Sequence, residues 1–487
     1  METQNTDTMY AQTMPSRRVP FGPHRWRAGV VALTLVIGLG TIACSQLGQP
    51  LGQPQSQNTP SVPVPAAGNW VQVLTGYALT SLKAARSDPA VIYACAAKQP
   101  ASGLGAQSKP TYTLLRSGDF GAHWQNIGKK FAFNKSCEFA INPSNSNEVY
   151  AVAAPPNSQS SSIFLHSTDG GQTWNTITPV YQIPGLQSGL LWSPLELRME
   201  GSQLFGLQAV PPSAFAQPGQ PTPSRPAASL PAQRLVASVD GGNNWTVLDS
   251  HFGSAMQTVR SYAVDPSNTD TIYEIVGAPF SPFLTIPSFS APGTSSSPSG
   301  YGGSLYKTVD SGSNWKLLQQ GVPYGMEVQL AANKSDLLYL GGTSLLTLNS
   351  LAVLQGTTSS SSGTSANGFN LSVSSDGGAN WRQVVIPAPL EFGKRWFVEA
   401  GGSVYVDTSE GIAPTTQSVV TVNGTPVTTP PPAIIQVYNP TTSSWSIVPM
   451  PPASGALLAV TPTGANSGVA WFIGNRKGLY IVYRNII

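Results

Sequence analysis

Three arginines, one glutamate and one tyrosine are the side chains of this sequence whose types could carry out chemistry together. Arg198, Arg260 and Arg395 each lie on a predicted strand, and Glu196 and Tyr262 lie on two of the same strands. Converging guanidinium groups can grip a carboxylate through paired hydrogen bonds, and a nearby glutamate can activate a tyrosine as a nucleophile. The five residues could therefore bind a carboxylate group and place an activated tyrosine beside it.

The elements that would position these residues are short strands joined by a recurring eight-residue turn. The turn is clearest from Ser167 to Trp174: a hydroxyl residue, an Asp two residues later, a Gly two after that and a Trp three further on. The carboxylate can accept hydrogen bonds from its own turn, and the glycine can adopt a positive φ. We expect the following Asp and Trp residues of the five copies to be structural: Asp119, Asp169, Asp240, Asp310, Asp376, Trp124, Trp174, Trp245, Trp315 and Trp381.

Each copy of the turn belongs to a predicted four-stranded meander, so the five copies indicate five structural repeats. Two degenerate units follow, one ending at Trp445 and one of three strands over residues 457–483, whose fourth strand we assign to residues 68–73. Charged residues make up only 10% of the chain, whereas Gly (48) and Pro (43) are plentiful, which favours strands and turns over helices. The sequence predicts an all-β fold, a single seven-bladed β-propeller over residues 68–487 closed by its N-terminal strand, with six blades as the alternative.

In such a ring the innermost strands surround the axis and need polar residues. Mutual ion pairing there also explains the arginines and glutamates, and we favour this interpretation over catalysis.

The segment before the propeller has the pattern of an export signal. Residues 1–27 form a basic leader, and residues 28–44 are an apolar segment that ends at Cys44. We expect either a cleaved lipoprotein, lipid-modified on Cys44, or an uncleaved membrane anchor. Residues 45–67, rich in Gln, Pro and Ser, would then tether the propeller outside the cytoplasm, on a bacterial cell membrane.

Net charge, cysteine content and histidine content indicate which ligands and bonds the chain can have. The net charge of +3 comes without a basic run in the propeller region, so we expect no nucleic-acid partner. Cys95 and Cys137 fall in successive repeats, where either a disulfide or two separately buried thiols would fit. Four scattered His residues and no Cys/His cluster predict no metal and no cofactor. We expect a monomer.

The long insertions share one position in their repeats. Residues 211–231, 278–303, 343–368 and 409–432 each fall between the second and third predicted strands, on the face opposite the Asp turns. Elaborated loops on a rigid scaffold are where binding usually resides, although these loops are also rich in Ser, Pro, Gly and Thr, as disordered segments are. The blade 4 insertion carries Phe280, Phe283 and Phe289, so it is our candidate binding loop.

The eight-residue turn resembles the Asp-box, also called the bacterial neuraminidase repeat. By this resemblance residues 68–487 are similar to the propellers of sialidases, sortilin-type receptors, xyloglucan hydrolases and the photosystem assembly-factor family with its bacterial relatives. In these families the box is structural and lies away from the active site. The Arg-Ile-Pro motif of sialidases is absent here. We therefore expect a non-catalytic binding or assembly scaffold for protein or glycan, closest to the bacterial relatives of the assembly factor. A sialidase-like glycoside hydrolase is the alternative.

Overall fold

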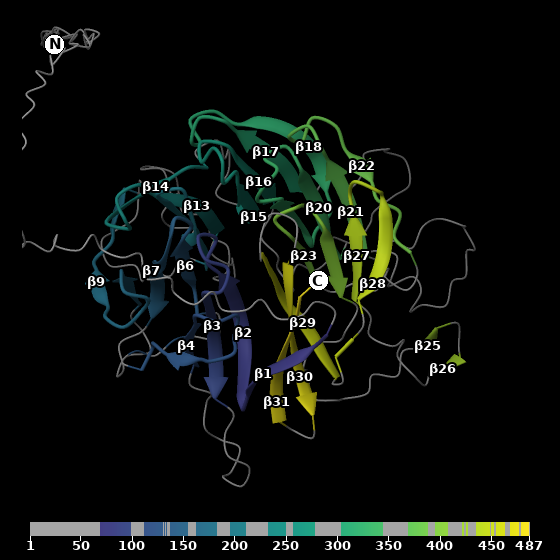
Figure 1. Cartoon of the computed structure of the whole chain (residues 1–487). Helices are drawn as coiled ribbons and strands as arrows, with labels where there is room; N and C mark the ends of the chain where they lie inside the picture. Colours follow the sequence, from purple (N-terminus) through teal and green to yellow (C-terminus); the bar gives the residue numbers. More distant parts are fainter. Residues whose placement is uncertain are drawn as a thin grey trace, which may run out of the picture. The chain divides into compact units, whose positions relative to one another are not determined.

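The computed structural model describes residues 69–98, 112–129, 131, 133, 137–153, 162–182, 195–210, 232–249, 257–277, 303–343, 369–387, 395–407, 421–422, 425–426, 435–448, 450–451, 454–462, 468–476 and 479–486. Within these ranges the chain is all-β, and its strands form seven main sheets and one two-stranded hairpin. Figure 1 shows the sheets side by side around a common centre, with β2, β15, β23 and β29 near it and β9, β14 and β28 toward the rim. The prediction of a seven-bladed propeller is confirmed.

Blades 1 to 4 are up-and-down meanders whose strands run from the axis to the rim. Blade 1 is β2 (Tyr77–Ala84), β3 (Ile92–Lys98), β4 (Tyr112–Ser117) and β5 (Gln125–Asn126). Blade 2 is β6 (Phe139–Asn142), β7 (Asn145–Ala153), β8 (Ile163–Ser167) and β9 (Asn175–Ile177). Blade 3 is β11 (Leu195–Glu200), β12 (Gln203–Val210), β13 (Ala232–Ser238) and β14 (Asn244–Val247). Blade 4 is β15 (Thr258–Val264), β16 (Ile272–Gly277), β17 (Gly303–Thr308) and β18 (Lys316–Val322).

The last three blades complete the ring. Blade 5 is β19 (Met326–Leu330), β20 (Leu338–Thr343), β21 (Phe369–Ser374) and β22 (Arg382–Gln383). Blade 6 is β23 (Arg395–Val398), β24 (Val404–Asp407), β27 (Ile435–Asn439) and β28 (Ser444–Val448), and the hairpin β25 (Thr421–Val422) and β26 (Thr425–Pro426) precedes β27. Blade 7 is β29 (Ser454–Pro462), β30 (Gly468–Arg476) and β31 (Leu479–Ile486), to which β1 (Val71–Thr75) adds the outermost strand. The N-terminal strand therefore closes the ring, as predicted, and removes an open sheet edge.

Blade 3 has a fifth strand that the sequence analysis did not predict. Strand β10 (Val180–Gln182) lies in the connection between blades 2 and 3 and pairs with the outermost strand, β14. The pairing is parallel, whereas every other strand pair within the described blades is antiparallel. The chain thus covers the outer edge of blade 3 with its own backbone.

The hydrophobic core is divided among the junctions between blades. The described residues form seven buried clusters, and each cluster takes side chains from two neighbouring blades. The cluster between blades 7 and 1 contains Trp471 from β30 and Leu115 from β4. Both faces of a blade pack against a neighbouring blade. Successive apolar side chains of a middle strand therefore point in turn into the core on one side and the core on the other, as Ile92 and Tyr93 of β3 do.

The five Asp turns, meaning the eight-residue repeats that end at Trp124, Trp174, Trp245, Trp315 and Trp381, share one hydrogen-bond pattern. In the second copy Ser167 Oγ donates to Asp169 Oδ1 at 2.8 Å and accepts from Gly171 N at 2.8 Å, while Thr173 N donates to Asp169 Oδ1 at 2.9 Å. These bonds, chiefly those from Thr173, lower the pKa of Asp169 to about 2. In all five copies the carboxylate accepts a hydrogen bond from the hydroxyl two residues before it, within its own turn.

The Asp turns also fasten one blade to the next. Trp174 Nε1 donates to Ile127 O of blade 1, and Trp315 Nε1 donates to Leu248 O of blade 3, both at 3.0 Å. At Gly242, φ is +89°, and an added Cβ would lie 2.2 Å from the Phe164 ring of blade 2. Both facts explain why this position requires glycine.

The long insertions enter where the sequence placed them, between the second and third strands of blades 3 to 6. Most of their residues, including Phe280, Phe283 and Phe289, lie outside the described ranges, as do Cys44 and the N-terminal leader. The hairpin of β25 and β26 is the described part of the blade 6 insertion. Among the residues that the structure describes, no helix is long and apolar enough to cross a membrane.

Candidate functional site

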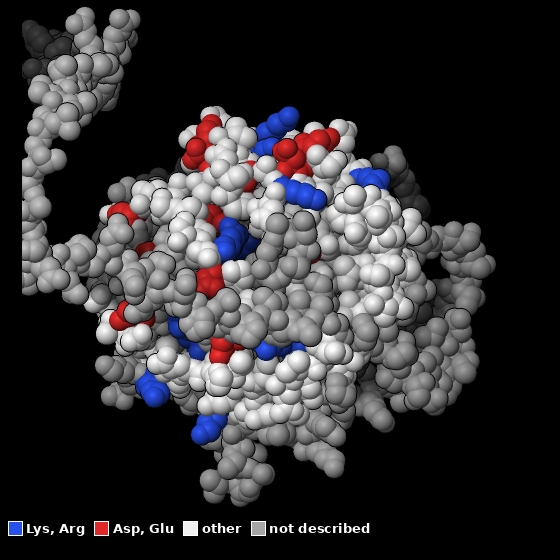
Figure 2. Space-filling view, in the orientation of Figure 1, with Lys and Arg blue, Asp and Glu red and all other residues white. Residues whose placement is uncertain are grey.

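Charged side chains from the inner strands of five blades come together near the propeller axis. We call this group the axial cluster; its members are Lys83, Glu138, Glu196, Arg198, Tyr262 and Glu327. Figure 2 shows acidic and basic side chains near one another in the middle of the ring. The cluster brings titratable groups from five blades within electrostatic reach of one another, so we take it as the candidate site.

Glu196 occupies a strained position in this cluster. Its φ is 51°, in the left-handed region, where a non-glycine residue pays about 1–2 kcal/mol. The strain coincides with a register shift on β11 between Leu195 and Arg198. Bulges of this kind redirect side chains, and strain is commonly kept at functional positions.

Tyr262 holds the strained backbone from the next blade. Its hydroxyl donates to the carbonyl oxygen of Glu196 at 2.5 Å, and its ring lies 4.9 Å from the Arg198 guanidinium. Arg198 Nη2 is 3.7 Å from Glu196 Oε2, and the two side chains keep 39% and 44% of their area exposed. Glu196 and Arg198 therefore form an accessible pair of opposite charges, and the hydrogen bond from Tyr262 of blade 4 holds the backbone of Glu196.

Lys83 ties three blades together on the same axis. Its ammonium group donates to Phe139 O at 2.6 Å and to Leu197 O at 2.8 Å, and it lies 5.0 Å from the centre of the Phe139 ring. Burial lowers the pKa of Lys83 to about 8, against the opposing effect of Glu138. Arg86, just after β2, forms a bidentate ion pair with Glu200 of β11, with Nη2 2.8 Å from Oε1.

The carboxyl groups of the axial cluster are not balanced by its cations. Burial raises the pKa of Glu196, with Glu327 and Glu138 adding to the effect and Arg198 opposing it. Burial also raises the pKa of Glu327. The pKa of the Tyr262 phenol is raised by burial, although Arg198 acts in the opposite direction. The phenol therefore stays protonated and acts as a hydrogen-bond donor.

The three predicted arginines have separate partners. Arg198 belongs to the axial cluster, whereas the Arg260 guanidinium lies 4.5 Å from the centre of the Tyr324 ring. Arg395 Nη1 donates to Leu457 O of blade 7 at 3.2 Å. The structure thus brings together Glu196, Arg198 and Tyr262 and gives the other two arginines different surroundings.

Sequence reasoning missed Lys83, because the carbonyl groups that it binds belong to residues 56 and 114 positions away. The signal available in the sequence was its place on an inner strand, just before the turn that contains Asp88. Among the described residues, no group of three or more His, Cys, Asp or Glu side chains is arranged to hold a metal ion.

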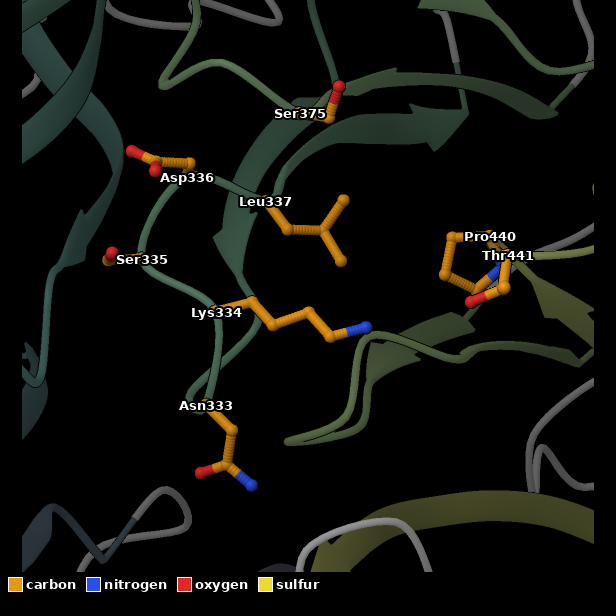
Figure 3. A pocket seen from close by; sticks show the side chains of 8 residues that line it. All are labelled: Asn333, Lys334, Ser335, Asp336, Leu337, Ser375, Pro440 and Thr441. Atoms are coloured by element: carbon orange, nitrogen blue, oxygen red, sulfur yellow. The ribbon is translucent and has the colours of Figure 1, made fainter.

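A separate cleft of about 420 Å³ lies between blades 5 and 6. It is bordered by the loop of residues 333–337, by Ser375, and by Pro440 and Thr441. Figure 3 shows the Lys334 side chain extending across it toward Pro440 and Thr441. These loops join the first to the second strand or the third to the fourth strand, so the cleft is on the face of the Asp turns.

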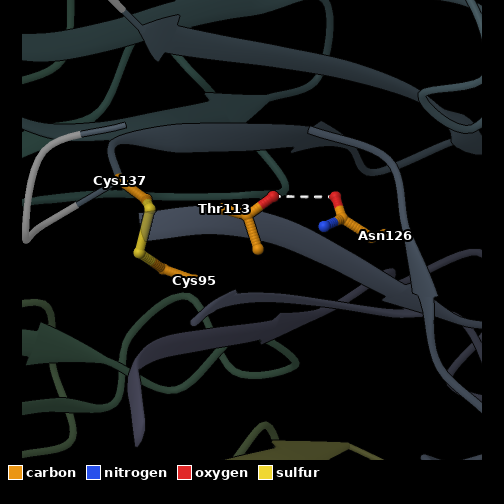
Figure 4. The surroundings of a disulfide bond; sticks show 4 residues. All are labelled: Cys95, Thr113, Asn126 and Cys137. Carbon is orange, nitrogen blue, oxygen red and sulfur yellow. Dashed lines mark hydrogen bonds between the residues drawn. A yellow bond between two sulfur atoms is a disulfide. The ribbon is translucent and has the colours of Figure 1, made fainter. Parts of the chain in front are cut away.

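Cys95 on β3 and Cys137, just before β6, form a disulfide with a Cα–Cα distance of 5.6 Å. Both residues are fully buried in the core between blades 1 and 2. Figure 4 shows the bond next to the hydrogen bond of 2.7 Å between Thr113 and Asn126 of blade 1. The disulfide is therefore a covalent link between two blades.

Comparison with known proteins finds similarity at the level of structure. No family model matches the sequence, and no curated protein matches it. Among solved structures, YCF48 from Cyanidioschyzon merolae is 13% identical with a TM-score of 0.44 over 86% of this chain and 99% of its own. YCF48 bound to D1 peptide is 13% identical with a TM-score of 0.44, over 85% and 94% of the two chains. The GH74 xyloglucanase from Xanthomonas campestris (Xcc1752) is 14% identical with a TM-score of 0.44, over 84% of this chain and 54% of its own. These similarities are distant, and the fold assignment rests on the strand pairings of the chain itself.

Proposed function

We propose that this chain is a non-catalytic binding scaffold that holds a protein or glycan ligand at the axial cluster and through the long insertions. The observation that carries the proposal is the position of Glu196. Its backbone has a φ of 51° and is held by the hydroxyl of Tyr262, while its side chain forms an accessible pair with Arg198. A rigid, strained and partly exposed charge pair is suited to recognising a polar ligand at low entropic cost.

The hydrogen bonding of Tyr262 favours binding over hydrolysis. A tyrosine nucleophile must transfer its proton to a base, but this hydroxyl donates to a backbone carbonyl rather than to a carboxylate. The raised pKa of Tyr262 opposes formation of the phenolate. Arg260 and Arg395 are occupied elsewhere, which leaves Arg198 as the arginine that contacts Tyr262. These features support a scaffold in preference to a sialidase-like glycoside hydrolase.

We further propose that the propeller works outside the cytoplasm, tethered to a bacterial membrane through residues 28–44 or a lipid on Cys44. The disulfide between Cys95 and Cys137 supports this location, because such bonds persist in oxidising compartments. The basic leader and apolar segment of the sequence support it independently. Membrane fractionation of cells with and without Cys44→Ala tests the lipid anchor: loss of the protein from the membrane fraction is expected.

Binding is tested on the purified chain with immobilised glycan and peptide arrays. We expect Arg198→Gln and Glu196→Gln each to weaken capture of the retained probe about tenfold or more, since a hydrogen bond to a charged group contributes about 1.5–3 kcal/mol. Lys316→Gln, at an exposed position on the outer strand β18, is the control and should leave capture unchanged. Equal capture by all four proteins, or turnover of a fluorogenic sialoside by the wild type, would contradict the proposal.

The contribution of the candidate binding loop is measured separately. Deletion of residues 278–303 would join β16 directly to β17, so a short Gly-Ser replacement that spans the same two strand ends is preferable. If Phe280, Phe283 and Phe289 contact the ligand, this variant captures less of the same probe while its thermal unfolding midpoint stays close to that of the wild type. Undiminished capture would confine the site to the axial cluster.

Tyr262→Phe should weaken ligand capture without removing any charge. The substitution deletes the donor that holds the Glu196 carbonyl, so the strained backbone can relax, and the lost buried hydrogen bond should cost about 1–3 kcal/mol of folding free energy. The matched control is Tyr273→Phe, whose hydroxyl donates to Gly377 O at another blade junction. Both variants should lose stability in urea unfolding, but only Tyr262→Phe should lose capture. If Tyr262→Phe and Tyr273→Phe capture the probe equally well, then the hydrogen bond from Tyr262 to the Glu196 carbonyl is not needed for binding.

A further inference from the structure

The cleft between blades 5 and 6 lies where the repeat of Asp turns is interrupted. Both connections of blade 6 on this face are shorter than those of blade 5. Its first two strands are joined by residues 399–403, against 331–337 in blade 5, and its last two by residues 440–443, against 375–381. In the frame set by the tryptophan of each turn, Pro440 stands where an Asp turn has its aspartate. Less chain therefore covers this end of blade 6, and the cleft of about 420 Å³ is found there.

The corresponding junction between blades 4 and 5 is bridged through an Asp turn. The hydroxyl of Tyr273 and the ammonium group of Lys307, both from blade 4, donate to Gly377 O in the Asp turn of blade 5, at 3.3 and 3.4 Å. Between blades 5 and 6 the tyrosine in the matching place, Tyr339, donates instead to Gly402 O in the short loop of blade 6. The shortened turn of blade 6 is therefore not used as Gly377 is used in blade 5.

Lys334 supplies a cation to this cleft. Figure 3 shows its side chain reaching toward Pro440 and Thr441, whereas the carboxylate of Asp336 points away from them. Among the described residues, the Lys334 ammonium group has no hydrogen-bond acceptor and no carboxylate within ion-pair distance. Its charge acts on Glu399 of blade 6, but that carboxyl is 5% exposed and burial raises its pKa, which favours the neutral form. Lys334 is therefore an available cation.

Both walls of the cleft are fixed by hydrogen bonds of the backbone. On the blade 5 side, Asn333 N donates to Ala400 O of blade 6 at 2.9 Å, which joins the loop that carries the lysine to the next blade. On the blade 6 side, Thr441 N donates to Asn439 Oδ1 at 2.9 Å within its own turn. Walls that are already ordered lose little conformational entropy when a ligand binds.

The rest of the lining is apolar or carries hydroxyl groups. Figure 3 shows the Leu337 side chain directed toward Pro440, so two apolar surfaces face each other across the cleft. Ser375 and Thr441 border it with hydroxyl groups. One ammonium group matches the single charge of a carboxylate, whereas a phosphate dianion would keep an unpaired charge. The volume falls within the range of about 300–1,000 Å³ that is usual for small-molecule sites.

We propose that the cleft between blades 5 and 6 is a second binding site, which takes a small carboxylate ligand of about the size of a monosaccharide. The carboxylate pairs with Lys334, and the apolar part of the ligand packs between Leu337 and Pro440. The site shares no residue with the axial cluster, so it goes beyond the proposed function. A sugar acid and an acylated amino acid both offer this chemistry, and the experiment separates the two sources.

Saturation-transfer difference NMR titrations of the purified chain test the site with two probes, glucuronate and N-acetyl-leucine. We expect at least one of them to bind, and its neutral counterpart, glucose or N-acetyl-leucine amide, to bind about tenfold or more weakly. Lys334→Gln should weaken binding of the same carboxylate about tenfold or more, since it removes a hydrogen bond between charged groups. Lys316→Gln, at an exposed position on β18, is the matched control and should leave binding unchanged. The probe that binds identifies the source of the carboxylate.

A second pair of variants tests the charge of the opposite wall. Pro440→Asp and Pro440→Asn both restore a side chain of the size found in an Asp turn, but only Asp can pair with Lys334 and compete with the ligand. We expect Pro440→Asp to bind the probe about fivefold or more weakly than Pro440→Asn, and less so in high salt. Thermal unfolding midpoints show whether each variant is folded, and this pair decides the outcome if Lys334→Gln is not.

Three results would overturn the proposal. The first is that the wild type binds neither carboxylate, and the second is that Lys334→Gln binds the probe as the wild type does. The third is that Pro440→Asp and Pro440→Asn bind it equally. Binding that survives Lys334→Gln but is lost in Arg198→Gln would place the carboxylate at the axial cluster, so failure of this site is distinguishable from failure of the proposed function.

Discussion

Replacing both Cys95 and Cys137 with alanine should lower the free energy of unfolding by about 4 kcal/mol. The bond joins positions 42 residues apart, and removing a cross-link of this span restores about 13 cal/mol/K of chain entropy to the unfolded state. The closed loop contains the third and fourth strands of blade 1, and without the disulfide its two ends are no longer cross-linked. Urea unfolding at neutral pH, followed by tryptophan fluorescence, measures the loss as a lower midpoint.

Reduction of the wild type supplies the matched experiment. Dithiothreitol should move the midpoint of the wild type toward that of the double variant, and it should not change the double variant, which has no bond between these positions. Because both sulfur atoms are buried, reduction should be slow under native conditions and fast once the chain is partly unfolded. A wild-type midpoint that does not respond to reductant after complete unfolding would show that the thiols are not joined.

Trp245→Ala should cost about 3–5 kcal/mol, the usual range for deleting a buried aromatic side chain. The Trp245 side chain is 0% exposed, its ring packs edge-on against Phe164 of blade 2 at 6.0 Å, and its Nε1 donates to Gly242 O at 2.9 Å. Phe164 also fills the space in which a Cβ on Gly242 would lie, so the cavity cannot be closed by moving the turn inward. Differential scanning calorimetry and urea unfolding give the loss of stability.

Trp174→Ala is the matched comparison for Trp245→Ala. Trp174 has the same place in its own Asp turn and donates to Ile127 O, but it is only partly buried. Its removal should therefore cost less than removal of Trp245. If the two variants lose equal stability, then the depth of the tryptophan does not determine the strength of a blade junction.

The local part of this fold was predictable because each Asp turn is stabilised within eight residues. Ser167, Asp169 and Thr173 bond to one another, so their spacing in the sequence is already the geometry of the turn. The two degenerate copies differ where Phe120 and Ser311 adopt φ values of 55° and 54° in place of the first glycine, yet they keep the same bonds. Counting the turns gave five blades, the degenerate unit that ends at Trp445 gave the sixth, and the last three strands with β1 gave the seventh.

The pairing of β10 with β14 could not be predicted. Strand β10 has only three residues. It pairs in parallel with β14, and since parallel strands are joined by a long connection, no hairpin turn in the sequence marks the pairing. Its sequence carries too little pattern to be distinguished from a linker. The same limit applies to the buried acids Asp249 and Glu274, which come from different blades and have no motif around them.

The strand repeats, the turns, the number of blades and the place of the insertions could be predicted from residue order, since they follow from hydrogen bonds and side-chain alternation over a few residues. Residue order also supplied the candidates Glu196, Arg198, Arg260, Arg395 and Tyr262. Which of them meet depends on the closed ring: closure sets the inner strands around one axis, and at the register shift on β11 Glu196 lies beside Arg198 and its carbonyl group accepts from Tyr262. Side chains more than 60 residues apart come into contact through the packing of whole blades, and that packing is a property of the closed ring.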